Sequence, residues 1–210
     1  MATSTASSSN KRSWDGDLEA QLQAVLDGGA AAASQWKGLS TLAFDATSLD
    51  DADLIPMTLR LVVMHDLAAK FSITARIWAQ FMTRVKHLMH PNPYHNFQHI
   101  CDVAQTTSAI LTDKSLSQKL NDFDKFTLII CALLHDLDHP GKNNAYQVNA
   151  GTELAIVYND MSVLENHHCA TSSRLMTESG VLDGVPAESK KQFRANFIEA
   201  ILATDMSKHF

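Results

Sequence analysis

Apolar residues recur every three to four positions over most of this chain, and this spacing constrains the fold more than any other feature. A period of three to four places such side chains on one face of an α-helix. The stripes are formed by Leu59, Val62, Val63 and Leu67; by Ile77, Phe81, Val85 and Leu88; by Phe97, Ile100, Val103, Thr107 and Ile110; by Phe123, Phe126, Ile130 and Leu133; and by Phe193, Phe197 and Ile201. Only 8 glycines and 5 prolines interrupt them, and no alternating pattern typical of strands recurs. The sequence therefore predicts an all-α fold.

The chain divides into three parts by composition. Residues 1–13 are rich in Ser and Thr and are expected to form a disordered tail. Residues 14–53 form an unassigned N-terminal segment, with one short helix predicted by Leu18, Leu22, Val25 and Leu26 and a linker at residues 28–34. The helical pattern then continues over residues 54–210, which we interpret as the main domain.

Several helix boundaries carry their own signals. Proline disfavours helical geometry in the residue before it, so His90-Pro-Asn-Pro ends the helix that contains Leu88, and Pro140-Gly141 bounds the one after Phe123. The sequence Ser162-Val-Leu-Glu165 has the S-x-x-E form of a capping box and predicts the start of another helix. A shorter helix is expected over Thr152–Tyr158.

Charge and cysteine content exclude several classes of protein. The net charge is −6 and no cluster of Lys and Arg occurs, which argues against binding to a nucleic-acid polymer. No apolar run approaches the roughly 18 residues that a membrane span requires. The three cysteines, Cys101, Cys131 and Cys169, are widely spaced and form no CxxC motif, so we expect free thiols and a cytoplasmic protein.

Histidine is the unusual residue, with ten in 210 positions. Three polar clusters lie at the ends of apolar helices: residues 94–99, residues 135–141 and residues 165–168, with Thr204-Asp205 as a later addition. Imidazole and carboxylate groups together suit divalent metals such as Zn, Mn and Mg. Either an HD pair or an HxxxH spacing alone is more often structural, but three such clusters beside core helices favour a metal site.

Two of these clusters also have a specific geometry. His135-Asp136 directly follows the apolar run IICALL, which would place two ligands where a buried helix ends. His95 and His99 are four residues apart, so one helical turn would place both on the same side. Glu165 has an alternative, structural explanation as the glutamate of the capping box.

The segments YHNFQH, HDLDHPGKNNAYQ, YNDMSVLENHH and ILATDMSKHF resemble consecutive motifs of the class I 3′,5′-cyclic-nucleotide phosphodiesterases. The resemblance covers about residues 54–210 and implies an HD-type helical bundle. The domain of that family continues beyond the last motif, so the resemblance implies that its C-terminal part is missing here. The family's remaining metal-ligating aspartate and its purine-binding residues then have no counterpart, and Asp205 is not a convincing replacement for that aspartate.

The resemblance implies a two-metal hydrolase that converts cyclic nucleotides into nucleoside 5′-monophosphates. His99, His135 and Asp136 match the ligands of a zinc-like first metal, and Asp136 also bridges to a second metal, Mg²⁺ or Mn²⁺. His95 matches the general acid, which Glu165 would orient if the two form a hydrogen bond. Residues that match supporting or substrate-facing positions are Tyr94, Asn96, His139, Glu165, His168, Thr204 and Asp205.

The substrate and the activity of this chain stay open at this stage. The segment NNAYQVNAGTELAIVYND is similar to the high-affinity cGMP-selective branch, so cGMP is slightly favoured over cAMP. Two alternatives remain: an HD-type hydrolase acting on another phosphoester, and a truncated, inactive fragment that binds a partner through exposed apolar helices. A homodimer is compatible with either the enzyme or the binding protein.

Overall fold

The protein is built from helices that pack in successive layers. The computed structural model describes residues 12–28 and 36–208, and all regular elements in these residues are helical. They are α1 (Arg12–Leu26), η1 (Ala46–Ser48), α3 (Asp51–Met64), α4 (Leu67–Lys70), α5 (Ala75–Leu88), α6 (Phe97–Leu111), α7 (Lys114–Ser117), α8 (Asp122–Leu134), α9 (Asn144–Asn149), α10 (Glu153–Val157), α11 (Val163–Ser179), α12 (Ala187–Leu202) and η2 (Met206–Lys208). The predicted all-α fold is confirmed.

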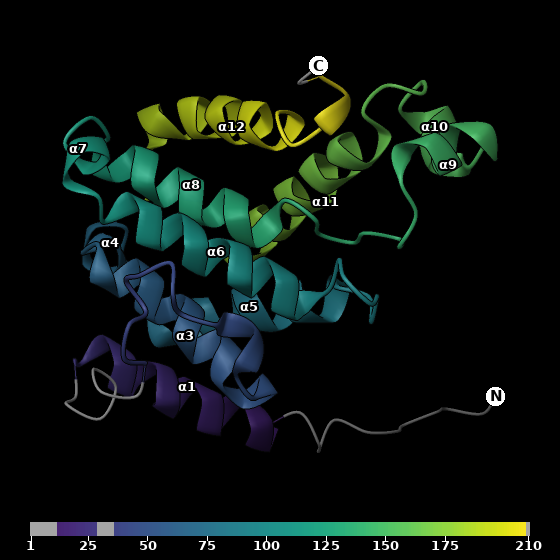
Figure 1. The fold of residues 1–210 in the computed structure, drawn as a ribbon. Coiled ribbons are helices and arrows are strands. Elements are labelled where there is room, and N and C mark those ends of the chain that lie inside the picture. Colours follow the sequence, from purple (N-terminus) through teal and green to yellow (C-terminus); the bar gives the residue numbers. More distant parts are fainter. Residues whose placement is uncertain (1–11, 29–35, 209–210) are drawn as a thin grey trace, which may run out of the picture.

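The helices do not pack in the order in which they follow one another along the chain. Helix α1 packs on α3 and α5, α3 packs on α6, α6 on α8, and α8 on α12 (Figure 1). Helix α11 contacts both α5 and α12 and so crosses the stack at one end. The short helices α9 and α10 extend outward from that same end (Figure 1). The connection that follows α8 contacts α11, where His168 Nδ1 bonds to the carbonyl of Leu137.

One continuous apolar core runs through these layers. Its largest fully buried side chains include Trp78 and Phe81 of α5, Phe126 of α8, and Phe193 and Phe197 of α12. The rings of α8 and α12 meet directly, because Phe126 and Phe193 have centroids 6.2 Å apart. Burying each such side chain contributes on the order of 2–3 kcal/mol. The apolar stripes that predicted the helices are thus the faces by which the helices pack.

Helix boundaries show where the sequence patterns were right and where they were wrong. The short helix predicted around Leu18–Leu26 is α1, which begins at Arg12; residues 1–11 and most of the expected linker lie outside the described residues. Leu67 does not continue α3, because Asp66 adopts a left-handed conformation (φ 59°) and starts the separate helix α4. Helix α8 ends at Leu134, well before Pro140, and α12 ends at Leu202.

The capping box predicted at the start of α11 is wrong. Ser162 is the N-cap residue, but it has a left-handed backbone (φ 42°) and makes no side-chain cap hydrogen bond. Its hydroxyl instead donates to Asp205 Oδ2 at 2.7 Å. The left-handed backbone directs the Ser162 side chain away from the first turn, so Glu165 is not used for capping and is available for another contact.

Two further observations bear on the classes of protein considered above. Cys101, Cys131 and Cys169 are free thiols, as predicted, and all three are buried. No helix in the described part of the chain is long and apolar enough to cross a membrane.

Candidate metal centre

The end of helix α8 brings a carboxylate into a ring of histidines. His135 is the C-cap residue of α8, and Asp136 follows it with a relative exposure of 8%. Because the helix stops at Leu134, the next side chains are free to leave the helix axis and face the loop before α6. The predicted position of His135 and Asp136 at the end of a buried helix is confirmed.

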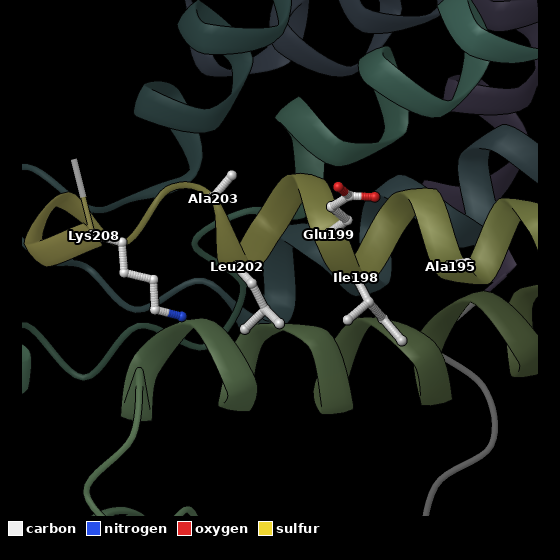
Figure 2. Close-up of a pocket in the computed structure, with 6 residues that line it drawn as sticks. All are labelled: Ala195, Ile198, Glu199, Leu202, Ala203 and Lys208. Carbon is white, nitrogen blue, oxygen red and sulfur yellow. The ribbon is translucent and has the colours of Figure 1, made fainter.

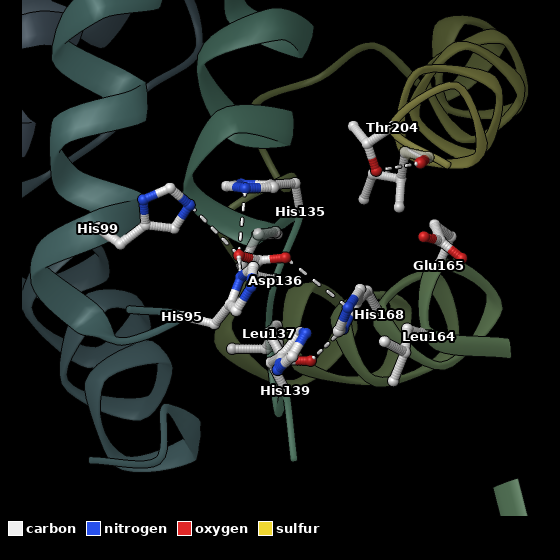
Figure 3. Close-up of polar contacts among 12 residues, drawn as sticks. His95, His99, His135, Asp136, Leu137, His139, Leu164, Glu165, His168 and Thr204 are labelled. Atoms are coloured by element: carbon white, nitrogen blue, oxygen red, sulfur yellow. Dashed lines mark hydrogen bonds and ion pairs between the residues drawn. The ribbon is translucent and has the colours of Figure 1, made fainter. Parts of the chain in front are cut away.

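Four histidines from several segments of the chain surround Asp136 (Figure 3). On Oδ2, His95 Nδ1 donates at 2.7 Å, His99 Nε2 lies at 3.3 Å and His135 Nε2 at 3.4 Å. On the other oxygen, His168 Nε2 lies 3.9 Å from Oδ1. The fold therefore gathers the first and second histidine clusters and His168 of the third at one carboxylate.

The outer hydrogen bonds of two histidines determine which ring nitrogen faces Asp136. His135 Nδ1 donates to the carbonyl of Ala132 at 3.0 Å, and His168 Nδ1 donates to the carbonyl of Leu137 at 2.7 Å. In the neutral tautomer, each Nε2 then carries a lone pair directed at the Asp136 carboxylate. Two acceptor atoms that face each other repel unless a cation lies between them. Proteins present ligands to a divalent metal in this arrangement.

Burial sets the charge of these groups. Burial raises the pKa of the Asp136 carboxyl, but the hydrogen bond from His99 and the other histidine neighbours outweigh it, so the net effect lowers the pKa. Burial lowers the pKa of His135, and it lowers the pKa values of His139 and His168 to about 4. At neutral pH the Asp136 carboxylate therefore lies beside the neutral imidazoles of His135, His139 and His168. Carboxylate and neutral imidazole together are a fitting donor set for zinc or a similar divalent ion.

Two groups of three donor atoms are compact enough to hold an ion, with all atoms of a group within 4.8 Å of one another. They consist of His95, His99 and Asp136, and of Asp136, His139 and His168. Asp136 belongs to both, so the two donor groups share one carboxylate. His135 belongs to neither group, although its Nε2 faces the same Oδ2 atom.

His139 has a different role from the other rings. Its Nδ1 accepts a hydrogen bond from the backbone N–H of Gly141 at 2.9 Å, so its proton in the neutral form is on Nε2. The ring stacks on His95 with centroids 3.9 Å apart and an interplanar angle of 12°. In this tautomer His139 offers a donor, which suits a water or a phosphoryl oxygen better than it suits direct metal ligation.

Glu165 lies near the cluster but has another partner than expected. It is 9% exposed, and its Oε2 accepts a hydrogen bond from Asn144 Nδ2 at 2.9 Å. The Asn144 side chain also accepts from the backbone N–H of Leu164 at 2.9 Å. The expected hydrogen bond between Glu165 and His95 is not formed, because His95 pairs with Asp136 instead.

The expected single turn of helix containing His95 and His99 is also absent. Helix α6 begins at Phe97, and Asn96 caps it by accepting a hydrogen bond from the His99 backbone N–H at 3.0 Å. His95 therefore lies in the preceding loop, and it reaches Asp136 from there. Asn96 has a structural role as the cap, while Tyr94 is 65% exposed with its ring beside those of His95 and His99.

Thr204 and Asp205 follow α12 and do not join the histidines. Thr204 Oγ1 donates to the carbonyl of Ile201 at 2.7 Å. Asp205 is 5% exposed and accepts hydrogen bonds from the Ser162 and Ser207 side chains, both at 2.7 Å. Asp205 thus ties the end of α12 to the start of α11.

Sequence patterns missed three residues that connect the site to its surroundings. They are Asn92, Asp138 and Asn144. None of them has an imidazole ring or belongs to the His135-Asp136 pair, the two features that marked candidate ligands. Asn144 could have been suspected from its place in HDLDHPGKNN, but its two contacts with α11 depend on the tertiary fold.

One surface depression is lined by α12 and by no histidine. It has a volume of about 550 Å³ and lies along α12, where Ile198 and Leu202 point toward α11 (Figure 2). A second depression of about 320 Å³ borders the loop before α6 and includes Asn96 and Phe97. The chemistry of the donor atoms, rather than the size of a cavity, identifies the candidate site.

Comparisons with known proteins find similar chains. The sequence profile of the 3′5′-cyclic nucleotide phosphodiesterase family matches residues 94–210. The 3′,5′-cyclic-nucleotide phosphodiesterase regA of Dictyostelium discoideum is 39% identical over 170 residues, which is 80% of this chain and 21% of that protein. The human high affinity cGMP-specific 3′,5′-cyclic phosphodiesterase 9A is 42% identical over 149 residues, which is 69% of this chain and 25% of that protein.

A solved structure extends the likeness to the fold. The phosphodiesterase domain of the Salpingoeca rosetta rhodopsin phosphodiesterase superposes with a TM-score of 0.79 at 34% identity, over 85% of this chain and 55% of that one. The chain thus spans about half of that solved domain and about a quarter or less of these two curated relatives. The matched region begins at Tyr94 and contains all the histidines around Asp136, and the chain belongs to the 3′,5′-cyclic nucleotide phosphodiesterase family.

Proposed function

We propose that this protein hydrolyses 3′,5′-cyclic nucleotides to nucleoside 5′-monophosphates with the help of two divalent metal ions. The observation that supports it most directly is the buried Asp136 carboxylate, toward which His135 and His168 present lone pairs. The named relatives are cyclic-nucleotide phosphodiesterases, so family membership indicates the reaction that these donor atoms would support.

The residues divide into metal ligands and a proton donor. His99, His135 and Asp136 would hold the first metal, with zinc favoured by the imidazole-rich set. Asp136 would also reach the second metal, where Mg²⁺ or Mn²⁺ is expected because oxygen donors and water suit these harder ions. Bound metal ions would lower the pKa of water for attack on the phosphorus and would neutralise charge on the phosphoryl oxygens.

His95 is the proposed general acid. Its Nδ1 donates to Asp136 Oδ2, which fixes the plane of the ring. Its side chain is 38% exposed, so Nε2 can approach a substrate from the open side of the site. A proton on Nε2 would go to the leaving 3′-oxygen of the cyclic phosphate, which would otherwise depart as an alkoxide. His139, stacked on His95, supplies a second donor beside it.

We further propose cGMP or cAMP as the substrate, with cGMP slightly favoured. The relatives include proteins named as cGMP-specific and as cyclic-AMP phosphodiesterases, so both purines occur among similar chains. The segment from Asn143 to Asp160 is the part whose resemblance favours cGMP. A cytoplasmic location and a homodimer are compatible with this proposal.

The direct test measures release of 5′-nucleotide from cGMP and cAMP by the purified chain with added Zn²⁺ and Mg²⁺ or Mn²⁺. We expect activity that a chelator removes. His95→Ala should reduce kcat by about 10²- to 10⁴-fold, the usual contribution of general acid catalysis. Asp136→Ala should abolish metal-dependent turnover, because both donor groups share this carboxylate.

His87→Ala is the matched control, because His87 is an exposed histidine on α5 and belongs to neither donor group found among the described residues. It should leave turnover unchanged. Equal activity in wild type and the His95 and Asp136 variants would contradict the residue assignment. Preference for nucleotides or phosphomonoesters over cyclic nucleotides would indicate another HD-type hydrolase instead, and metal binding without any turnover would favour a binding role for this chain.

A further inference from the structure

Two loops carry most of the candidate site, and both need to be held at a defined separation. Residues 89–96 connect α5 to α6 and carry His95, while residues 135–143 connect α8 to α9 and carry Asp136 and His139. The stacked rings of His95 and His139 meet across this gap. Side chains of Asn92 and Asp138 also cross the gap, one from each loop.

Asn92 connects the two loops through their backbones. Its Nδ2 donates to the carbonyl of His95 at 3.0 Å and to the carbonyl of His139 at 2.7 Å. Both bonds therefore end on the two residues whose rings stack. Gly141 permits this close approach, since a Cβ atom there would lie 2.6 Å from Asn92 Oδ1 and the backbone has φ +76°.

Asp138 makes the complementary connection from the other loop. Its Oδ1 accepts from His90 Nε2 at 2.8 Å, and its Oδ2 accepts from His167 Nε2 at 2.8 Å. His90 lies in the loop that carries His95, and His167 lies in α11 next to His168. The carboxylate thus joins three segments that contribute donors to the candidate metal centre.

The Asp138 contacts have a structural character rather than that of a metal site. Each carboxylate oxygen is engaged by a different imidazole, and the three residues do not form a compact donor group among the described residues. Asp138 also adopts a left-handed backbone (φ 63°), a conformation that costs roughly 1–2 kcal/mol for most residues other than glycine. This backbone conformation turns Asp138 between the two histidines while Asp136, two residues earlier, faces the ring of metal-site histidines.

We propose that Asn92 and Asp138 are positioning residues that lock the loop of His95 to the loop of Asp136 and to α11, and so set the separation of the metal-binding groups. The inference rests on the proposed metal centre and adds the residues that pre-organise it. Supporting residues that orient metal ligands typically change metal affinity by about 10- to 100-fold when replaced. Neither residue touches the metal-facing nitrogens or Asp136 in the contacts described above.

The test is Co²⁺ binding to the full chain, followed by visible absorption, because Co²⁺ reports ligand geometry as well as affinity. Asn92→Asp keeps the shape but replaces the N–H donor with an acceptor facing two carbonyls. Asp138→Asn keeps one acceptor oxygen and tolerates the left-handed backbone. Asp138→Gly removes both acceptors without a backbone penalty. We expect each variant to bind Co²⁺ about 10-fold more weakly, with an altered absorption band.

Gln105→Glu is the matched control for Asn92→Asp. Gln105 Nε2 also donates to two backbone carbonyls, those of Leu39 at 2.7 Å and Thr41 at 2.9 Å, but neither carbonyl belongs to the loops that carry His95 and Asp136. The same chemical change should therefore lower the thermal midpoint while leaving the Co²⁺ affinity and band of the wild type. Circular dichroism verifies that each protein is folded.

Three results would overturn the inference. The first is unchanged Co²⁺ affinity and spectrum in folded Asn92 and Asp138 variants, while Asp136→Ala does not bind; the metal centre would then stand without the lock. The second is an equal loss of affinity in Gln105→Glu, or unfolding of all three loop variants, which would assign the effect to general stability. The third is no Co²⁺ binding by the wild type, which would remove the proposed metal centre itself.

Discussion

At the scale of single residues, the chemistry depends on how Asp136 is buried. An isolated carboxylate in the interior is costly unless charged or donating groups surround it. His95 stabilises the carboxylate directly, because its Nδ1 donates to Oδ2. His135 and His168 instead donate from Nδ1 to backbone carbonyls, so the lone pairs of their Nε2 atoms face Asp136. These outer bonds hold the rings as ligands, and they would keep His135 and His168 oriented before any metal arrives.

The lowered histidine pKa values predict that the metal-free protein loses stability as the pH falls from about 6.5 toward 4. His139 and His168 have pKa values of about 4 in the folded chain, against an ordinary value of 6.5. Between these values the unfolded chain binds protons that the folded chain does not, so unfolding is favoured at lower pH. His65 and His135, whose pKa values burial also lowers, act in the same direction.

The expected slope is at most about 1.4 kcal/mol per pH unit for each histidine. Urea denaturation at pH 7, 6 and 5 in the presence of a chelator measures it. The His139→Gln, His168→Gln double variant should show a shallower slope over the same range. A constant unfolding free energy in the wild type between pH 7 and 5 would contradict the burial of neutral imidazoles.

At the scale of elements, the ends of helices position the site. Helix α8 stops at Leu134 so that His135 and Asp136 turn inward, and α6 starts at Phe97 under the cap of Asn96 so that His95 remains in a loop. The first turns of α11 supply Glu165 and His168. Helix ends serve this purpose because the chain there changes direction, while the helices behind them remain fixed by the apolar core.

The connection between α11 and α12 predicts a sharp contrast between two glycines. A Cβ atom at Gly184 would lie 1.9 Å from the Phe71 carbonyl oxygen at the end of α4, and a backbone atom cannot move aside easily. Gly184→Ala should therefore destabilise the protein by about 1–3 kcal/mol or more, as overpacking does. Gly16 is exposed within α1, and a Cβ atom added there would have no other atom within 4 Å. Gly16→Ala should therefore stabilise the protein by about 0.5–1 kcal/mol, because alanine favours the helix.

Chemical denaturation of the two variants beside wild type measures both effects. Opposite signs are expected from the same substitution, because only one glycine faces a packed backbone. Similar effects of the two changes would mean that the α11–α12 connection does not pack on α4 as described.

At the scale of the whole molecule, the candidate metal centre lies where several parts of the chain meet. The residues around Asp136 come from the loop before α6, from α6 itself, from the end of α8 and from α11 (Figure 3). Helix α11 in turn contacts α5 and α12. A ligand bound at this junction would therefore connect α6, the end of α8 and α11.

Metal binding should accordingly raise the stability of the folded chain as a whole. A ligand that binds only the folded state, at 100 times its dissociation constant, stabilises by about 2.7 kcal/mol. Differential scanning fluorimetry with Zn²⁺ or Mn²⁺, and again after chelation, should show an upward and reversible shift of the thermal midpoint. Asp136→Ala should remove the shift, and an equal shift in that variant would place the binding elsewhere.

Much of the fold follows from local patterns in the sequence. Apolar spacing along Ile77–Leu88 and Phe97–Ile110 predicted α5 and α6 because a helix repeats its faces over a few residues, and the surrounding fold has little influence on that repeat. The histidine-rich segments predicted a metal-binding chemistry for the same reason, since donor types are properties of the residues themselves. The resemblance of these segments to the phosphodiesterase motifs then named His99, His135 and Asp136 as the candidate ligands.

The partners of these residues depended on the tertiary structure. His95 pairs with Asp136 rather than Glu165, Glu165 pairs with Asn144, and Ser162 donates to Asp205 rather than capping its own helix. Each contact joins segments at least 21 positions apart, and a single left-handed residue can redirect a side chain from one neighbour to another. The sequence by itself determined which chemical groups are present and which faces of the helices are apolar; only the packing of those faces decided which groups meet.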